Sequence, residues 1–571
     1  MSTAAARKRK REGDAKVSEM EKDAKKVFKA APGDNLSFDL GETFQGKFAE
    51  GITLSEATVT VMNRFAEERK AVTFDEVTLE DKPSNYHPND VKLETFISRR
   101  ISLKGAGIIS AAMDTVTEAE LALALAKMGG IGILHRNLSV EEQSAMVNWV
   151  RRKIHFGGMI DKPIVFHENM HFSDMQATIA AHGYTFTSFP IVNDKDCLVG
   201  LVTRDEMEFA EHHNPILKDI MKLRCSIVTA PEGTTRIDAY TIMKAKHVKK
   251  LPVVTTDGRV KGMYVWSDVR SDEQKRENFS LDHKGNFLVG AAIGVGEDDM
   301  RRVKELASAG CPLLVIDSSH GACKPALDQV RRIKLAFQDQ FDVVVGNIAS
   351  YESAMYLLRG EYKPDALKVG IGPGSICTTR QVTGHGIPQL TAVYQVWRAV
   401  QDYGKETGYY VPIIADGGIR TSGDIVKCFA AGASAVMMGG IFAGTKESPG
   451  QVIQKGGKTF KTVRGMGSRS AMEERSGSRH RYHRESKKTG VTETLTTHQK
   501  QKVVPEGVEG LVLLKGTVES VMTELLGGIQ AGLSHTGCNN IKEFRNNATF
   551  WVQSTAGVSE GRPHDLTDIR T

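Results

Sequence analysis

The chain has 571 residues, of which 40% are hydrophobic and 25% charged, and its formal net charge is +6. No apolar run reaches the roughly 18 residues that a membrane-spanning helix needs, and no apolar signal segment follows Met1, so the sequence argues against a membrane protein and against secretion. The seven cysteines form no CxxC pair, which disfavours a disulfide framework or a zinc ribbon and favours a reducing, cytoplasmic compartment.

Residues 1–50 are predicted to form a disordered basic tail. The first 30 residues hold ten Lys or Arg and five Asp or Glu, so they carry a surplus of +5 and leave the rest of the chain nearly neutral. Such a segment has too little apolar surface to form a core. The basic run at 7–11 also fits a nuclear address or a contact with a polyanion. A solvated tail is the preferred interpretation, and nucleic-acid binding is not expected.

From Val72 onwards, short apolar runs alternate with helical patterns, as in βα units. Such runs are typical of strands buried on both faces of a parallel sheet. Their polar or glycine ends recur at steps of 30, 23, 46 and 23 residues, which predicts an α/β protein with a (β/α)8 TIM barrel and a catalytic rim. A doubly wound sheet is disfavoured because no GxGxxG opens a helix. The residues at these ends are Asp317, Asn347, Gly370, Asp416 and Gly439.

The barrel is predicted in two portions, 51–160 and 276–571, separated by an internal repeat within 161–275. FPIVNDKDCLVGLVTRDE at 189–206 matches LPVVTTDGRVKGMYVWSD at 251–268 with an offset of 62 residues. The repeat resembles a tandem pair of CBS motifs, modules that bind adenosine nucleotides.

In CBS motifs a Thr or Ser, with an Asp three residues on, grips a ribose. The first copy here has Thr203 with Glu206 at that spacing and Asp205 one residue early, whereas the second copy offers only Ser267 and Asp268. Two interpretations therefore stay open, a module that binds a nucleotide effector and a regulatory shell that has lost some of its sites.

Two further motifs are interpreted as coincidences. HENMH at 167–171 matches the zinc motif HExxH, but it follows a strand-like run and lies in too short a polar piece for a buried helix. GGKT at 456–459 ends like a phosphate-binding P-loop, yet the first glycine of that motif would fall on Val452. We expect neither a metal site nor a P-loop there.

The stretch GIGPGSICTTR at 370–380 carries the strongest chemical signal. Cys377 lies between a strand-like run and a long helical pattern, on the predicted rim, whereas other cysteines lie in apolar periodic segments. Glycines let the backbone approach a ligand, and a helix N-terminus favours both thiolate and phosphate. A nucleophile or phosphate loop is preferred over a structural turn. Glycine pairs at 417–418 and 439–440 match the phosphate site that such barrels form near strands 7 and 8, which predicts a phosphorylated substrate.

A longer set of motifs resembles the IMP dehydrogenase / GMP reductase family. The resemblance runs from about residue 70 to about residue 565, and the CBS-like repeat falls where that family carries one. The motifs are, in chain order, TFDEV, AAMDTVTE, GGIGILHRN, IDSSHG, GIGPGSICTTR, ADGGI, RGMGS, RY at 481–482 and VVPEGVEG.

The resemblance implies an NAD-dependent oxidation of IMP to XMP. Cys377 would attack C2 of the purine, NAD would take the hydride, and water would hydrolyse the covalent adduct. Arg481 and Tyr482 would activate that water from a flap at about 445–505, with Thr379 and Glu506 as a second proton route.

The resemblance also implies the binding residues. NAD would contact Asp317, Ser318, Ser319, Gly370, Ile371 and Gly372. IMP would contact Ser375, Asp416, Gly417, Gly418, Gly439, Gly440, Val463, Arg464, Gly465, Met466, Gly467 and Glu506.

A monovalent cation site is implied as well. Carbonyl oxygens of Gly372, Gly374 and Cys377 would hold K+ together with Glu560, Gly561 and Arg562 of a neighbouring subunit, which implies a homotetramer.

Three departures from the family pattern keep rivals open. Gly440 and Val463 replace residues that would offer hydroxyls to the phosphate, and the segment after Tyr482 is longer and more basic than expected. GMP reductase, which converts GMP and NADPH to IMP and ammonia, is the first rival, and the glycine pair at 439–440 leans its way. A catalytically inactive nucleotide sensor is the second. The RY pair, DSSHG and Cys377 favour the dehydrogenase.

Overall fold

The structure is a computed structural model, which describes residues 51–156, 159–160, 163–182, 187–210, 214–474 and 504–564. Arg481, Tyr482, the flap segment 475–503 and the predicted basic tail lie outside the described residues. The chain divides into two compact units, one built from the residues up to Arg151 together with those from Phe279 onwards, and one from Arg152–Asn278. Each unit is described by itself.

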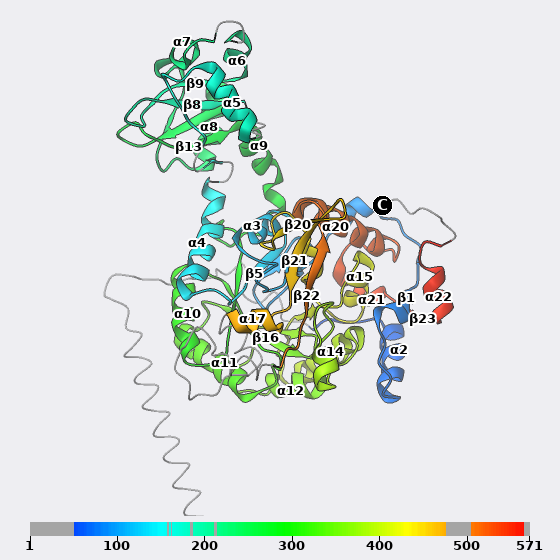
Figure 1. Cartoon of the computed structure of the whole chain (residues 1–571). Helices are drawn as coiled ribbons and strands as arrows, with labels where there is room; N and C mark the ends of the chain where they lie inside the picture. The colour runs from blue at the N-terminus through cyan, green and yellow to red at the C-terminus, as the bar shows by residue number, and fades with distance from the viewer. Residues whose placement is uncertain are drawn as a thin grey trace, which may run out of the picture. The chain divides into compact units, whose positions relative to one another are not determined.

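The larger unit is a closed parallel barrel of eight strands, which confirms the predicted fold (Figure 1). The strands are buried almost throughout, as their continuous apolar runs predicted. Around the barrel they follow the order β14-β15-β16-β17-β18-β19-β4-β5. Their bounds are β4 (Ile108–Ser110), β5 (Ile131–Leu134), β14 (Gly290–Ile293), β15 (Leu313–Asp317), β16 (Asp342–Ile348), β17 (Ala366–Val369), β18 (Ile413–Asp416) and β19 (Ala435–Met438).

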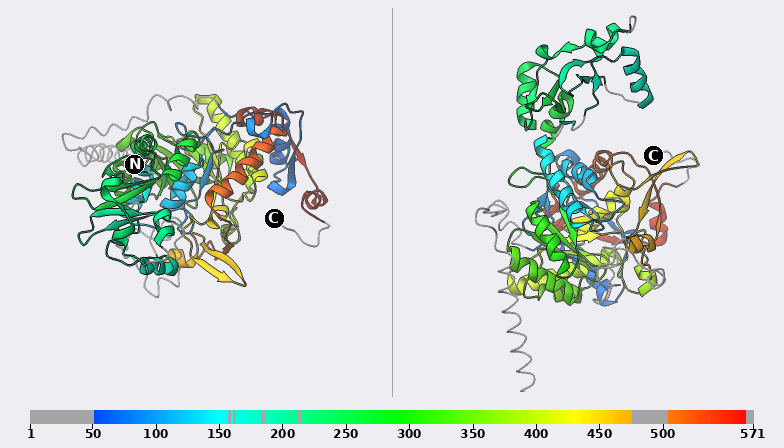
Figure 2. Two further views of the ribbon diagram at one scale, coloured as in Figure 1. Left: turned by 90° about the horizontal axis from the view of Figure 1, so that it is seen from above. Right: turned by 60° about the vertical axis from the view of Figure 1, so that its left-hand side comes forward.

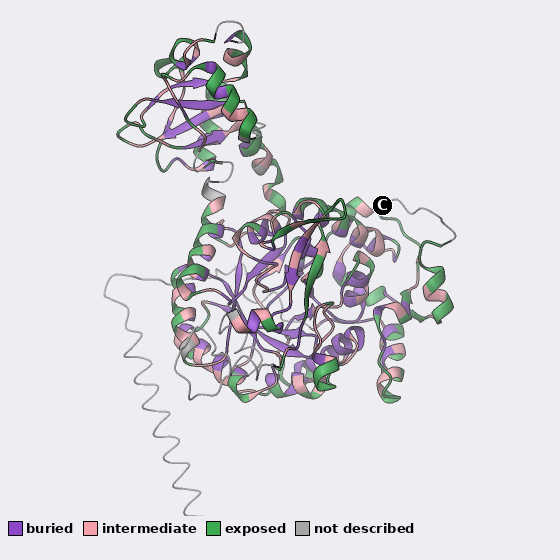
Figure 3. Ribbon diagram, in the orientation of Figure 1, coloured by how far each residue is buried: buried purple, intermediate pink, exposed green. Residues whose placement is uncertain are grey.

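Helices surround the barrel with buried inner faces and exposed outer faces (Figure 3). The C-terminal α20 packs against α15 and α3. The helices are α3 (Ala119–Lys127), α4 (Val140–Phe156), α10 (Asp298–Ser308), α11 (Lys324–Phe337), α12 (Tyr351–Leu358), α13 (Thr379–Thr383), α14 (Gln389–Thr407), α15 (Ser422–Ala430), α16 (Gly440–Ala443), α20 (Val518–Ser534) and α21 (Ile541–Asn547).

A three-stranded antiparallel sheet follows α16 and stands out from the barrel in the views of Figure 2. It consists of β20 (Val452–Lys455), β21 (Lys458–Arg464) and β22 (Glu509–Leu513), and α17 (Arg469–Glu474) follows β21. Gly456 and Gly457 of the GGKT segment form the tight turn between β20 and β21, both with positive φ, and Lys458 and Thr459 begin β21. The segment is therefore part of a hairpin.

The two ends of the described chain meet beside the barrel. The 3₁₀ turn η1 (Phe74–Glu76) leads into β1 (Val77–Leu79), which pairs antiparallel with β23 (Phe550–Val552). The remaining elements of this unit are α2 (Glu56–Glu67), η2 (Pro88–Asp90), β2 (Thr95–Phe96), β3 (Ser102–Leu103) and α22 (Thr555–Glu560).

The smaller unit contains the internal repeat, and both copies form a hairpin followed by a helix. The pair β8–β9 leads into α6, and the pair β12–β13 leads into α9. Two sheets result, in the orders β10-β9-β8-β7 and β11-β12-β13-β6. The bounds are β6 (Met159–Ile160), β7 (Phe166–His167), α5 (Phe172–His182), β8 (Phe189–Val192), β9 (Leu198–Val202), α6 (Arg204–Ala210), α7 (Leu217–Ile220), β10 (Lys222–Leu223), η3 (Arg224–Ser226), β11 (Ala230–Pro231), α8 (Arg236–Lys246), β12 (Lys250–Val254), β13 (Val260–Val265), α9 (Trp266–Lys275) and η4 (Arg276–Asn278).

The HENMH segment belongs to two different elements. His167 ends β7, and its Nε2 lies 2.9 Å from a carboxylate oxygen of Asp194, whereas His171 precedes α5. The two histidines therefore do not share a helix face. Within the described part of the chain, no helix is long and apolar enough to cross a membrane.

Candidate active site

The carboxyl ends of the barrel strands surround a cleft of about 860 Å³, counted with its open mouth. Residues of the glycine-rich loop, of the β15 and β18 ends and of the segments near 466 and 506 line it. The predicted site residues found among its walls are Asp317, Ser319, Gly370, Ile371, Gly372, Gly374, Cys377, Thr379, Asp416, Gly417, Gly465, Met466, Gly467 and Glu506.

A short chain of polar groups starts at Cys377. Its Sγ lies 3.2 Å from the Thr379 hydroxyl oxygen, and that hydroxyl donates to Glu506 Oε2 at 3.0 Å. Thr379 and Glu506 are buried, with 8% and 6% of their surface exposed, whereas Cys377 is only partly buried. A thiol at the cleft is thus connected to a shielded carboxylate through one hydroxyl, which is an arrangement that can move a proton.

Backbone pairing brings Glu506 to the cysteine loop although 127 residues separate it from Thr379. The Thr378 N–H donates to Glu506 O at 3.0 Å, and the Val508 N–H donates to Ile376 O at 2.9 Å. The Glu506 N–H in turn donates to Gly467 O at 2.9 Å. The loop, the 465–467 segment and the 506–508 segment therefore form one hydrogen-bonded layer.

Close approach of neighbouring backbone explains the glycines of the loop. Gly370 has φ +147°, and a Cβ there would collide with Asp416 O; Gly372 has φ +69°, and a Cβ there would lie 2.7 Å from Arg380 Cγ. The Arg380 side chain holds the loop in place, because its Nε donates to Ile371 O at 2.9 Å and its Nη2 donates to Ile387 O at 2.6 Å. Burial lowers the pKa of Arg380 from its ordinary value.

The floor of the cleft holds a buried ammonium that the sequence reasoning missed. Lys368 Nζ lies 2.7 Å from Asp416 Oδ2 and 3.3 Å from Asp317 Oδ1, and it also contacts Asn347 Oδ1. Asn347 Nδ2 donates to Asp416 Oδ2 at 2.9 Å and to Gly370 O at 2.7 Å. We call Lys368, Asp317, Asn347 and Asp416 the cleft-floor cluster. A lysine inside the apolar run ALKV was the signal that could have revealed it.

The two predicted glycine pairs follow neighbouring strands of the barrel, and the first comes directly after Asp416. Gly417 and Gly418 follow β18 with φ +87° and +76°, and Gly439 and Gly440 open α16. A Cβ on Gly440 would lie 3.5 Å from the Ser375 hydroxyl oxygen. Ser375 is exposed, and of these residues only Gly417 is among the walls of the cleft.

Other predicted residues have different surroundings. Val463 is buried and, with Arg464, lines a second hollow outside the main cleft. The Arg464 guanidinium forms an ion pair with Asp114, with Nη2 2.7 Å from Oδ2. Ser318 is also buried, and its hydroxyl donates to His320 O at 3.1 Å.

The residues predicted to serve a neighbouring subunit lie away from the cleft of their own chain. Glu560 ends α22, Gly561 follows as its cap, and the Arg562 guanidinium lies 3.6 Å from Asp75. Among the described residues no cluster of three or more His, Cys, Asp or Glu side chains suits a metal ion.

In the smaller unit, the candidate ribose-binding residues in the first copy of the repeat form hydrogen bonds with one another. The Thr203 N–H donates to Glu206 Oε2 at 2.9 Å, and Lys222 Nζ lies 3.3 Å from Oε1. Partial burial raises the pKa of Glu206, but the hydrogen bonds from Thr203 and Lys222 outweigh it and lower the pKa. In the second copy the Ser267 hydroxyl donates to Asp268 at 2.8 Å.

The fold and the cleft define an α/β-barrel enzyme with a partly buried cysteine in the cleft at the carboxyl ends of its strands. A family model described as IMP dehydrogenase / GMP reductase domain matches residues 71–564. The chain belongs to this family.

Curated relatives and solved structures agree with that assignment. The inosine-5'-monophosphate dehydrogenase of Aquifex aeolicus is 40% identical over 505 residues, which cover 88% of this chain and 97% of that protein. The enzyme of the same name from Staphylococcus aureus is 39% identical over 506 residues, with the same coverage. The crystal structure of a GMP reductase variant from Trypanosoma brucei matches with a TM-score of 0.72 and 32% identity, covering 87% of this chain and 100% of that chain.

Proposed function

We propose that this protein is an IMP dehydrogenase, which oxidises IMP to XMP with NAD through a covalent adduct on Cys377. The observation that carries the proposal is the Cys377–Thr379–Glu506 chain at the wall of the cleft, in a protein about 40% identical to dehydrogenases of that name.

The first half of the reaction requires the purine C2 to meet the cysteine. The Gly417–Gly418 turn and Ser375 hold the phosphate end, and Asp416 accepts hydrogen bonds from the ribose hydroxyls. The Cys377 thiol releases its proton to solvent, its sulfur forms a bond to C2, and the C2 hydrogen departs with its electron pair. The residues along the Asp317 side of the cleft would hold NAD, which would supply the acceptor for this hydride.

The second half releases the product by hydrolysis. A water oxygen forms a bond to C2, the C–S bond breaks, and the sulfur recovers a proton. Thr379 is placed to take a proton from that water and to pass one to Glu506, since the carboxylate is an acceptor 3.0 Å away. The resemblance assigns the main base to Arg481 with Tyr482.

The residues present suit the two expected ligands besides IMP. Asp317 and Ser319 with the 370–372 loop provide carboxylate, hydroxyl and backbone groups along one side of the cleft for NAD. Gly372, Gly374 and Cys377 offer carbonyl oxygens in one tight turn, and hard oxygen ligands suit K+. Glu560, Gly561 and Arg562 of a neighbouring subunit would complete that site in a homotetramer. The CBS-like unit is proposed to hold a nucleotide effector, and the enzyme is proposed to act in the cytoplasm.

GMP reductase is the second candidate, because the structural matches carry that name and Gly439–Gly440 leans toward it. In that reaction the same cysteine would displace ammonia from C2 of GMP, and NADPH would deliver the hydride.

One assay separates the two. Absorbance at 340 nm should rise with IMP, NAD and K+, and should not fall with GMP and NADPH. Absence of NADH formation from IMP, with NADPH consumption from GMP, would replace the first candidate with the second. Loss of both activities in the intact chain would favour an inactive nucleotide sensor.

Cys377→Ala should abolish NADH formation, because the covalent adduct requires its thiol. A more selective test is Glu506→Gln, which keeps the shape but cannot take a proton. We expect hydrolysis of the adduct to slow by about 100-fold when Glu506→Gln is added to an Arg481→Gln chain, and by less when it is made alone, while the first burst of NADH persists in both. Glu509→Gln, three residues on and exposed, is the matched control. An equal loss of the burst would contradict the assigned step.

A further inference from the structure

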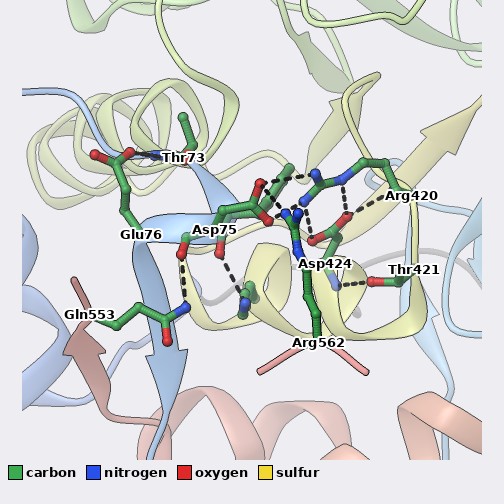
Figure 4. Close-up of polar contacts among 10 residues, drawn as sticks. Thr73, Asp75, Glu76, Arg420, Thr421, Asp424, Gln553 and Arg562 are labelled. Atoms are coloured by element: carbon green, nitrogen blue, oxygen red, sulfur yellow. Dashed lines mark hydrogen bonds and ion pairs between the residues drawn. The ribbon is translucent and has the colours of Figure 1, made fainter. Parts of the chain in front are cut away.

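A second set of charges joins the turn after β18 to the C-terminal segment (Figure 4). Both terminal nitrogens of Arg420 donate to the two carboxylate oxygens of Asp75, at 3.0 and 2.7 Å. Arg420 Nε donates to Asp424 Oδ2 at 3.1 Å, and Arg562 Nη2 approaches Asp75 Oδ2 at 3.6 Å. We call Asp75, Arg420, Asp424 and Arg562 the surface cluster.

Arg420 is tied directly to the nucleotide-facing turn. Only the buried Ile419 separates it from Gly418. Its backbone N–H donates to Asp424 Oδ2 at 2.9 Å, and Asp424 lies in the first turn of α15, where its own N–H is capped by the Thr421 hydroxyl. A shift of the 416–418 turn is therefore transmitted to the guanidinium of Arg420 through a short, hydrogen-bonded stretch of backbone.

Asp75 is held from the opposite side by the C-terminal part of the chain. Gln553 Nε2 donates to Asp75 O at 2.8 Å, and the Gln553 N–H donates to Glu76 O at 3.0 Å. Lys427 Nζ of α15 donates to Phe74 O at 2.9 Å. The backbone around Asp75 is thus fixed between α15 and the segment after β23, and the two hydrogen bonds from Arg420 orient its carboxylate.

The charge balance makes Asp75 the group that holds Arg562. Three cations lie here, Arg420, Lys427 and Arg562, against two carboxylates, Asp75 and Asp424. Without Asp75, three cations would face one carboxylate that lies under Arg420. Arg562 would then meet repulsion where it now meets attraction.

We propose that Asp75 is a positioning residue that couples the nucleotide-facing turn to the C-terminal segment 555–562. Ligand binding at Gly417 and Gly418 fixes Arg420, Arg420 fixes the Asp75 carboxylate, and Asp75 fixes Arg562 beside Glu560 and Gly561. The inference rests on the proposed function, which assigns IMP to the turn and cation ligands for a neighbouring subunit to the segment. Occupancy of one cleft would thereby prepare the cation site of the next subunit.

Hydrogen–deuterium exchange on the full-length protein tests the coupling without requiring catalysis. Saturating IMP should slow exchange in peptides covering 555–562 by about two- to five-fold, the range that an exposed ion-pair network can supply. Asp75→Asn should remove this slowing while exchange in peptides covering 370–380 still responds to IMP. Asp81→Asn, an exposed aspartate six residues away, should behave like the unaltered chain.

Two outcomes would overturn the coupling, and they differ from failure of the proposed function. Slowing at 370–380 without any at 555–562 in the unaltered chain, or slowing at 555–562 that persists in Asp75→Asn, rejects the coupling alone. If GMP slows exchange at 370–380 and IMP does not, the proposed substrate is rejected. The exchange at 555–562 in the unaltered chain and in Asp75→Asn is then measured with GMP. In Asp75→Asn the K+ concentration for half-maximal NADH formation should rise about two- to five-fold, and an unchanged value rejects the link to the neighbouring subunit.

Discussion

The two charge clusters of the barrel differ mainly in their contact with water. In the cleft-floor cluster, Lys368 and Asp317 have side chains that are 2% and 3% exposed. In the surface cluster, Arg420 and Asp75 are 53% and 41% exposed. Distances within the two clusters are similar, with shortest ion pairs of 2.7 Å in both. Ion pairs of similar length can therefore contribute different amounts to the free energy of unfolding, depending on how far they are buried.

Burial changes what the loss of one partner does. Removing a partner from a buried cluster leaves the other charges without water and without compensation. At the surface, water and salt take over most of that compensation. The cleft-floor cluster should therefore determine whether the site forms at all, whereas the surface cluster should adjust how parts of the chain are placed.

The largest effect is expected for Lys368→Met. Methionine fills a similar volume but leaves the buried Asp317 and the partly buried Asp416 carboxylates with no cation between them. We expect the free energy of unfolding of the barrel to fall by about 3–5 kcal/mol, together with loss of IMP binding. Denaturant titration followed by tryptophan fluorescence measures the first, and Lys405→Met, at an exposed site of α14, is the control.

A double variant sharpens this prediction. Asp317→Asn added to Lys368→Met removes one of the two uncompensated charges, so it should restore part of the stability that the single variant loses. If the double variant is as unstable as the sum of the two single variants, the three side chains do not act as a cluster and the contrast with the surface fails.

Asp424→Asn tests the inner end of the surface cluster and should have an intermediate effect. Asp424 is 5% exposed and accepts from both the backbone and Nε of Arg420, although Arg420 itself reaches solvent. Asparagine keeps one acceptor oxygen but loses the charge, and we expect a loss of about 1–2 kcal/mol in unfolding free energy. A loss of unfolding free energy as large as that of Lys368→Met would show that burial of one member of an ion pair is enough to make its removal costly, even when the other member is exposed.

The features that could be predicted from the sequence are those that depend on residues close together in the chain. The barrel strands were predictable because each apolar run ends at a residue of the rim, as at Asp317 in β15 and Asp416 in β18. The glycine loop around Cys377 was recognised for the same reason, since its chemistry is concentrated in eleven consecutive residues. These features depend on neighbours in the chain.

Contacts between distant residues were not predictable from pattern. Asp75 and Arg420 are 345 residues apart, and nothing in the spacing of either indicates the other. Glu506 was assigned to the site only by the family resemblance, because its contact with Thr379 depends on how the 504–508 segment pairs with the cysteine loop. Lys368 was missed since a strand-like run was interpreted as wholly apolar.

The smallest effect on stability is expected for Asp75→Asn, and its dependence on pH and salt identifies its origin. Hydrogen bonds from Arg420 lower the pKa of Asp75, while partial burial acts against them. A carboxylate whose pKa is lowered on folding stabilises the protein above its ordinary pKa of about 4, and this contribution disappears as the pH falls through the lowered value. After screening by solvent we expect at most about 1 kcal/mol at pH 7.

Thermal unfolding of the unaltered chain and of Asp75→Asn, at pH 7 and near pH 3 and in low and 1 M salt, measures this contribution. The two melting temperatures should differ by no more than a few degrees at pH 7 in low salt, and should converge at acid pH and at 1 M salt, where the Debye length is about 3 Å. A difference that survives both treatments would come from packing and not from charge.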